Sequence, residues 1–287
     1  MRRLRHLSGQ HRTAATNRLL GALLAFNAGA INAGGFLLVA MYTSHMTGFA
    51  SMLADNLVLG NVKLVLGAFG ALLSFTAGAA ATAVLVNWAR QHRLRSEYAL
   101  PLLVEAVLLL IFGLMGATLT RQTPFAVPLT LLVLAFTMGL QNALVSKISS
   151  SQIRTTHMTG VITDIGIELG KMFYWNRTGL PPESRVRANR IKLRLFSTLL
   201  AMFIAGGLVG AIGFKYVGFV WVVPLALLLL ALSLPPLYAD FQRMNRLRKA
   251  RLARESGWIL AVRKNLDPEA LFARKWNSYN HLVCSAI

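Results

Sequence analysis

Charged residues are scarce in this sequence, and acidic residues are the scarcest of them. Only 14% of the 287 residues are charged, against roughly 25% in a typical soluble domain. Ten Asp and Glu residues stand against 30 Lys and Arg residues, which gives a formal net charge of +20. A water-soluble fold of this length needs more charged surface than that. The composition therefore argues against a soluble domain.

Cysteine is almost absent. The single one, Cys284, excludes an internal disulfide and fits a reducing compartment without proving one. The chain has no Cys pair, no H-E-x-x-H sequence and no nucleophile elbow, the signatures of several metal-dependent and hydrolytic enzymes. We therefore expect no enzyme: no catalytic residues, no metal and no other cofactor.

Long apolar runs are what the sequence has in abundance. Hydrophobic residues make up 55% of the chain, and the mean hydropathy is +0.54. They fall into stretches of about twenty residues, the length that crosses a hydrocarbon core as a helix. Six such transmembrane helices are predicted, at Leu19–Met41, Lys63–Ala89, Leu100–Thr120, Ala126–Val145, Leu195–Phe214 and Phe219–Tyr238.

The basic residues are sorted along the chain. All but three of them lie before the first span, after the second, after the fourth or after the sixth; the exceptions are Lys63, Arg121 and Lys215. Basic loops stay on the cytoplasmic side, so the sorting predicts a multi-pass protein with both termini in the cytoplasm. Because the basic residues flank the spans, we do not expect a nucleic-acid partner.

An internal duplication organises the six spans. Residues 25–33 (AFNAGAINA) match residues 135–143 (AFTMGLQNA), and His45-Met46-Thr47-Gly48 matches His157-Met158-Thr159-Gly160 at nearly the same spacing. Further on, Phe75-Thr76-Ala77-Gly78 aligns with Phe203-Ile204-Ala205-Gly206. Since each copy has three helices, the second copy enters the membrane from the opposite face, as in many transporters. The predicted fold is an all-α membrane protein of two inverted three-helix repeats.

The boundaries follow from these two patterns. We expect a cytoplasmic basic N-terminus at residues 1–18, the first repeat at 19–120, the second at 126–238 and a cytoplasmic basic amphipathic tail at 239–287. In the tail, Phe241, Met244, Leu247 and Leu252 lie along one side of an Arg-rich helix, which favours contact with anionic lipid headgroups. Asp267-Pro268-Glu269 predicts the start of a second short helix.

A short helix is predicted after the first span of each repeat, starting at the Thr-Gly pair and broken or re-entrant. Thr is expected as the N-cap, and the positive end of the helix dipole would face an anion or a carboxylate. The alternative is that both motifs are turns at the membrane interface that let helices pack. On the first interpretation, a substrate pathway includes Asn32, His45, Thr47, Gly48, Asp55, Asn142, His157, Thr159, Gly160 and Asp164.

Three further groups of polar residues keep two interpretations each. Glu105 in the third span is either buried and paired or reaches the interface, and Glu168 lies either in the pathway or in the membrane interface near Lys171. The amides of the first and fourth spans fit hydrogen bonds between helices, and Asn32 and Asn142 fit pore lining equally well. Gly206-Gly207-x-x-Gly210 predicts a close helix contact.

These motifs resemble those of the YoaK-like bacterial inner-membrane proteins, a domain family of unknown function. The resemblance rests on Ala28-Gly29, Asn32-Ala33, Thr47-Gly48 and residues 139–143 and 155–160, and it covers about residues 20–238. It implies a six-helix fold in the bacterial inner (plasma) membrane, without an activity. The family is associated with Asp where this chain has Asn32, so a titratable group is missing there, which argues against proton coupling at this position.

The expected function is a transporter or channel for a small anionic or zwitterionic solute. Two alternatives come from other classes. One is a membrane scaffold or lipid-surface protein that acts through its basic tail. The other is a membrane-embedded metal-dependent enzyme in which His45, His157, Asp164 and Glu168 converge. The expected partners are the lipid bilayer and the solute; the oligomeric state stays open, a homo-oligomer included.

Overall fold

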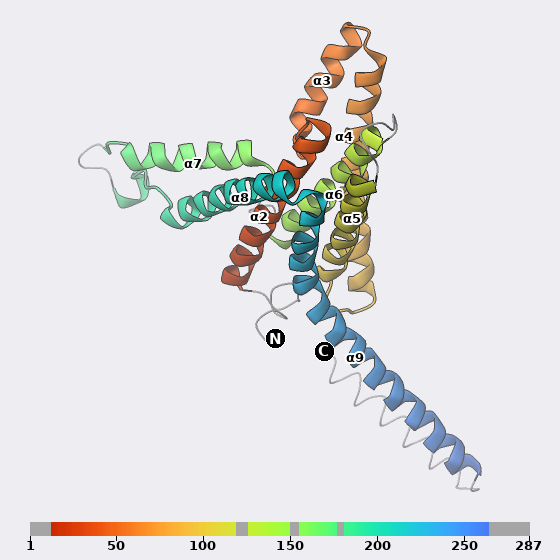
Figure 1. The fold of residues 1–287 in the computed structure, drawn as a ribbon. Helices are drawn as coiled ribbons and strands as arrows, with labels where there is room; N and C mark the ends of the chain where they lie inside the picture. Colours follow the sequence, from red (N-terminus) through yellow and green to blue (C-terminus); the bar gives the residue numbers. More distant parts are fainter. Residues whose placement is uncertain (1–12, 119–125, 150–154, 177–180, 264–287) are drawn as a thin grey trace. The chain divides into compact units, whose positions relative to one another are not determined.

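The described residues of the chain are helical throughout apart from short connections. The computed structural model describes residues 13–118, 126–149, 155–176 and 181–263, and within these ranges there is no strand (Figure 1). The helices are α2 (Ala14–Val39), α3 (Met46–Val58), α4 (Val62–Gln91), α5 (Ala99–Thr118), α6 (Ala126–Ile148), α7 (Met158–Phe173), α8 (Arg190–Tyr216) and α9 (Val222–Arg263), with 3-10 turns η1 (Pro182–Ser184) and η2 (Gly218–Trp221).

Six of these helices are long and apolar enough to cross a membrane. They are α2, α4, α5, α6, α8 and the first part of α9, and each lies where the hydropathy predicted a span. The all-α prediction is confirmed for the described residues, and the chain is a multi-pass membrane protein. One end differs: α9 continues to Arg263 through Pro235 and Pro236 instead of ending at Tyr238.

The chain divides into two compact units just after this proline pair. One unit is Met1–Leu237 and the other is Tyr238–Ile287. The second unit contains the predicted Arg-rich helix, in which Phe241, Met244 and Leu247 are all at least half exposed. The predicted helix start at Asp267-Pro268-Glu269 lies outside the described residues.

Capping side chains set where the helices start. A capping box joins Thr13 and Thr16 at the start of α2, with each backbone N–H donating to the other residue's hydroxyl. Asn61 caps α4 by accepting from the N–H of Leu64, and Asn189 caps α8 by accepting from those of Ile191 and Lys192. These amides satisfy N–H groups that have no partner inside the helix.

Two close helix crossings build the first unit. α2 packs most extensively on α8, and α4 on α6. A Cβ at Gly29 of α2 would overlap the carbonyl oxygen of Phe203 in α8, and one at Gly206 would overlap that of Phe26. Only glycine allows backbones to approach this closely. The predicted close contact of Gly206 and its neighbours is thus confirmed.

The second crossing repeats the first with the matching residues. A Cβ at Gly139 of α6 would overlap the carbonyl oxygen of Phe75 in α4, and one at Gly78 would overlap that of Phe136. Hydroxyl groups add bonds beside it, because Ser74 donates to Leu132 O at 2.7 Å and Thr82 donates to Leu140 O at 2.9 Å. Each repeat therefore packs its first helix on the second helix of the other repeat.

The short helices α3 and α7 each lie along the helix that follows them. α3 packs on α4, and α7 packs on α8. In α3 only Phe49 and Asn56 are buried, and in α7 only Val161 and Glu168. Most of each short helix is therefore exposed in the chain by itself.

Candidate functional site

The two His-Met-Thr-Gly segments have the same local structure. In both, the helix begins at Met and the preceding His is the N-cap residue. A Cβ at Gly48 would lie 2.6 Å from Nδ1 of His45, and one at Gly160 would overlap Nδ1 of His157. The imidazole folds over the first turn of its helix, so a larger residue in place of the glycine would require the exposed imidazole to move. The motif thus specifies a helix start.

The expected capping role of the threonines is wrong. Thr47 and Thr159 are the second residues of their helices, and both are exposed. The helix starts earlier because helical hydrogen bonding already begins at the histidine: the N–H of Phe49 donates to His45 O, and the N–H of Val161 donates to His157 O. A residue inside the first turn cannot act as the cap.

The structure places the two motifs apart. His45 and His157 are both exposed, and in the described residues α3 and α7 share no extended contact with each other (Figure 1). The sequence left open whether the motifs meet at one site. In this chain they form two separate places, one beside α4 and one beside α8.

Asn32 connects the first span to the first motif. Its Oδ1 accepts from the hydroxyl of Ser44 at 3.2 Å and from the N–H of Ser44 at 3.4 Å. The matching residue in α6, Asn142, is half-buried, and its Oδ1 has no partner in the part of the chain that the structure describes. The predicted equivalence of the two amides therefore holds for their positions on the helices and not for their contacts.

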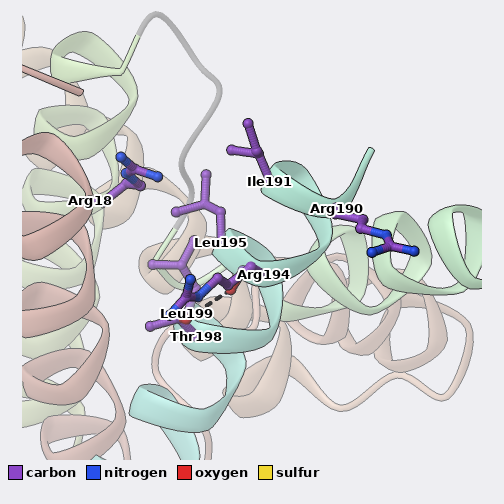
Figure 2. A pocket seen from close by; sticks show the side chains of 7 residues that line it. All are labelled: Arg18, Arg190, Ile191, Arg194, Leu195, Thr198 and Leu199. Atoms are coloured by element: carbon purple, nitrogen blue, oxygen red, sulfur yellow. Dashed lines mark hydrogen bonds between the residues drawn. The ribbon is translucent and has the colours of Figure 1, made fainter. Parts of the chain in front are cut away.

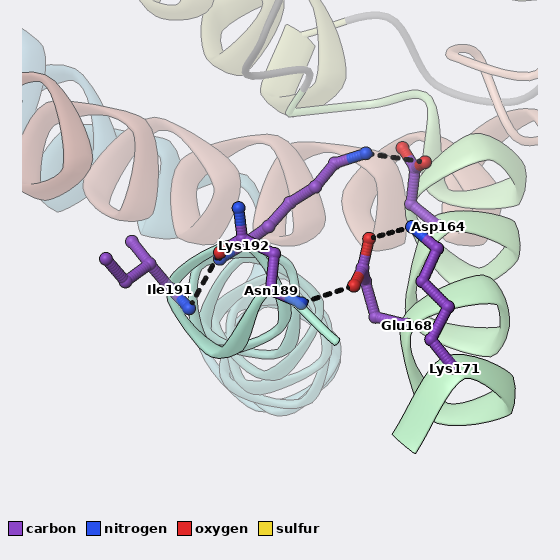
Figure 3. Close-up of polar contacts among 6 residues, drawn as sticks. All are labelled: Asp164, Glu168, Lys171, Asn189, Ile191 and Lys192. Atoms are coloured by element: carbon purple, nitrogen blue, oxygen red, sulfur yellow. Dashed lines mark hydrogen bonds and ion pairs between the residues drawn. The ribbon is translucent and has the colours of Figure 1, made fainter. Parts of the chain in front are cut away.

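The acidic residues of α7 join it to the start of α8. Oδ1 of Asp164 lies 3.3 Å from Nζ of Lys192. Glu168 is only 2% exposed; it accepts from the N–H of Asn189 at 2.7 Å and pairs with Nζ of Lys171 at 2.9 Å (Figure 3). The N–H of Asn189, followed by the Lys171 ammonium, holds the pKa of Glu168 below its usual range. Glu168 therefore lies near Lys171, as the second interpretation expected, and the structure adds that the two side chains are paired.

Asp55 has a different position. It is exposed on α3, whereas Asp164 takes part in the contact between α7 and α8. In the sequence, Asp55 is seven residues after Gly48 and Asp164 is four residues after Gly160, a difference of three that predicts equivalent faces of the two short helices. Counted from the motif glycines, the residue that matches Glu168 is Asn56, which is buried and donates to Met52 O at 2.8 Å. The buried polar positions of the two helices match, and the acids do not.

A carboxyl group lies in the interior among three spans. Glu105 of α5 is fully buried, and its Oε1 accepts from Nε2 of Gln141 in α6 at 2.8 Å and from Nδ2 of Asn27 in α2 at 3.4 Å. Nε2 of Gln141 also lies 3.4 Å from Leu24 O. For Glu105 the buried alternative is confirmed. The hydrogen bonds between helices that were expected of the amides are confirmed for Asn27 and Gln141.

Three oxygens of this interior cluster have no hydrogen-bond partner among the described residues. They are Oε2 of Glu105, Oδ1 of Asn27 and Oε1 of Gln141, all on side chains with no exposed surface. Buried acceptors without donors are costly, and they are therefore uncommon in folded proteins. The arrangement suits a ligand that brings N–H or O–H donors, and a positive charge on that ligand would balance the carboxylate.

The sequence indicated each of these three residues without indicating that they meet. An ionisable residue inside an apolar span is a signal of function, and it was present at Glu105. The partners are 36 and 78 residues away along the chain. Nothing local in the sequence predicts that contact.

Metal binding by the four residues of the enzyme alternative finds no support in the geometry. Within the described residues, no three His, Cys, Asp or Glu side chains are grouped as a metal site would require. His45 and His157 lie on different short helices, and Asp164 and Glu168 are engaged with lysines.

Comparison with known proteins identifies a family. A family model described as "Protein of unknown function (DUF1275)" matches residues 20–234. Neither the curated proteins nor the solved structures contain a match. The matched segment contains four of the six candidate spans and both His-Met-Thr-Gly motifs whole, and it includes most of the first span and the first part of the last. It is consistent with the resemblance to the YoaK-like proteins.

Proposed function

Since the chain belongs to the DUF1275 family of proteins of unknown function, we propose from its own geometry that it is a transporter or channel for a small zwitterionic solute. The pathway runs between two inverted three-helix halves, and the interior cluster of Glu105, Asn27 and Gln141 binds the solute's ammonium group. The protein acts in the bacterial inner membrane, with both termini in the cytoplasm.

The packing of the halves supports this architecture. Gly29 and Gly206 meet at one crossing and Gly139 and Gly78 at the other, so each half contributes one helix to both. In each crossing, the first helix of one half packs on the second helix of the other half. This reciprocal packing is what we expect of two inverted repeats, a common design in transporters. A movement of one half against the other would change both crossings together.

The interior cluster carries the proposal. A carboxylate with two amide oxygens offers three acceptors to a cationic N–H donor, and an ammonium group has three N–H bonds. Charge-assisted hydrogen bonds in a water-excluded interior are the strong ones. An isolated buried carboxylate is expensive in lipid, and such a group usually lies on a substrate or ion pathway.

The short helices supply the other part of the proposed selectivity. His45 and His157 are the N-cap residues of α3 and α7, and their side chains make no capping bond. We assign the carboxylate of the solute to these helix starts as it enters and leaves, one on each side of the membrane. Asn32, which holds Ser44 beside His45, would position the first of them. Asn142, Thr47, Thr159, Asp55 and Asp164 remain predicted pathway residues on this proposal.

Uptake into proteoliposomes tests the proposal. The full chain is reconstituted and assayed with a panel of amino acids and of simple carboxylates that lack an amine. We expect uptake of at least one amino acid. Glu105→Gln, which keeps the size of the side chain, should lower that uptake about tenfold or more, because loss of a charge-assisted hydrogen bond costs about 1.5–3 kcal/mol.

A matched control and a second pair of variants complete the test. Glu183→Gln removes an exposed carboxylate from η1 and should leave uptake unchanged. His157→Ala and Thr159→Ala should abolish it if α7 belongs to the pathway. Undiminished uptake by Glu105→Gln would contradict the ammonium site. Uptake of amine-free carboxylates alone would contradict the zwitterion.

A further inference from the structure

A basic pocket opens between the first turns of α8 and the start of α2. Its volume is about 330 Å³, and it lies away from the interior cluster of Glu105. Arg18 reaches it from α2, and Arg190 and Arg194 belong to α8 (Figure 2). None of the described residues that line it is acidic. The pocket therefore combines an open hollow with positive charge from two different spans.

The two arginines of α8 carry charge that no carboxylate among the described residues balances. Arg190 and Arg194 lie one helical turn apart, a spacing at which like charges repel. Within the described ranges neither of them pairs with a carboxylate, whereas the neighbouring Lys192 pairs with Asp164. The repulsion between Arg190 and Arg194 on α8 is thus not compensated by a carboxylate, whereas the charge of Lys192 is. A bound anion would compensate it.

Below the arginines the wall of the pocket is apolar. Ile191 is 71% exposed at its edge, Leu195 is half-buried, and Leu199 is fully buried at its base. Figure 2 shows Arg18 and Arg194 on either side of Leu195. A free phosphate would use the guanidinium groups and leave this wall in contact with water. A phospholipid would use both parts of the pocket, since its phosphate is anionic and its acyl chain is apolar.

The position along the helices agrees with a lipid. α2 and α8 both begin at this pocket, and the charge sorting predicts that both begin at the cytoplasmic face. Basic pockets between spans at that level bind anionic headgroups. Guanidinium groups are well suited to phosphate because they donate in a planar fork.

We propose that this pocket binds one anionic phospholipid, with its phosphate at Arg18 and Arg194 and an acyl chain along Ile191, Leu195 and Leu199. The site is separate from the basic tail, and it does not depend on the proposed transport. Because it joins α2 to α8, a bound lipid stabilises the crossing at Gly29 and Gly206.

Thermal unfolding of the full chain in a neutral detergent tests the site. Phosphatidylglycerol, phosphatidylcholine, sn-glycerol 3-phosphate and inorganic phosphate are added separately. Phosphatidylglycerol should raise the unfolding temperature, and the other three should not. The apparent affinity should fall about tenfold for each of Arg18→Gln and Arg194→Gln, as expected when one charge-assisted contact is lost. Native mass spectrometry should show one fewer retained phosphatidylglycerol in the double variant.

The control pair Arg95→Gln and Arg187→Gln removes the same charge from exposed positions outside the pocket and should keep the full response. An equal loss in the control pair would overturn the proposal, because the effect would then belong to overall charge. An equal response to inorganic phosphate would overturn the lipid as the ligand. If the double variant does not fold, the two single variants are compared with Arg95→Gln alone.

Discussion

At the scale of single residues, two buried carboxyl groups show how partners decide a role. Glu168 has the ammonium of Lys171 and the N–H of Asn189 within 2.9 Å. Glu105 has two amide donors and, within the described residues, no cation. The carboxylate of Glu168 is therefore satisfied by the protein, and it strengthens the contact between two helices. A carboxylate whose second oxygen is unpartnered is the better candidate for a ligand.

Glu168 gives a prediction for the pH dependence of stability. Its pKa is lowered in the folded chain, so its contribution is present above the usual Glu range and is lost as the pH falls through the lowered value. Glu168→Gln should lower the unfolding temperature at neutral pH. It should also flatten the loss of stability on acidification.

Thermal unfolding in detergent at several acidic and neutral pH values measures both effects. Glu183→Gln, on an exposed turn, is the matched control and should follow the unchanged protein. If the unfolding temperature of Glu168→Gln falls on acidification as steeply as that of the unchanged protein, Glu168 is not the group responsible.

At the scale of helices, the duplicated Phe-x-x-Gly sequences determine how close the spans come. Phe26 and Gly29 of α2 meet Phe203 and Gly206 of α8, and the corresponding residues of α4 and α6 meet in the same way. Phe75 and Phe203 are separated along the chain by the same number of residues as Asn61 and Asn189, which cap α4 and α8. A third sequence match, between Leu59-Gly60 and Leu169-Gly170, has no structural counterpart. Gly60 forms the turn after α3 with a φ of 71°, whereas Gly170 lies inside α7.

The glycine crossings predict opposite effects for two substitutions in the same helix. Gly78→Ala should destabilise the protein by about 1–3 kcal/mol or more, because its methyl group would overlap the Phe136 carbonyl oxygen in a packed interface. Gly67→Ala has open space and should stabilise the helix by about 0.5–1 kcal/mol.

Unfolding by a denaturing detergent, followed by circular dichroism, measures both variants of α4. Gly67→Ala serves as the control for helix propensity, since it differs from Gly78→Ala only in its surroundings. Equal effects of the two substitutions would refute the close crossing.

At the scale of the whole molecule, the chain separates a membrane unit from a basic helical extension. The family match ends at residue 234, close to the end of the first unit at Leu237. The exposed apolar residues Phe241, Met244 and Leu247 lie among arginines in the second unit. This pattern keeps the scaffold alternative open, and a deletion separates it from transport.

Removal of residues 240–287 should leave solute uptake in proteoliposomes within about twofold of the full chain, because the proposed pathway residues all precede this segment. With the protein held in nanodiscs of neutral lipid, the deletion should reduce its binding to vesicles of anionic lipid, as loss of surface charge does. Loss of uptake at normal reconstitution yield would assign the function to the tail. Arg95→Gln with Arg187→Gln controls for the loss of charge.

The sequence by itself determined the class of the protein, its number of spans and its duplication. These follow from features that are local, namely runs of apolar residues and short motifs, and lipid leaves helices as the way to satisfy the backbone of such a run. Each predicted span agrees with a helix because that constraint acts within one segment. The sixth span and the Arg-rich helix of the tail were predicted as separate segments, and the structure joins them in one helix, α9.

Only the tertiary structure decided which polar residues share a site. Asn32, His45 and His157 were chosen from motifs, and the structure shows those motifs as two separate helix starts. Glu105, Asn27 and Gln141 come together from α5, α2 and α6. Their contact depends on how spans cross, and crossing is set by the glycine contacts between α4 and α6 and between α2 and α8, which join residues far apart in the chain.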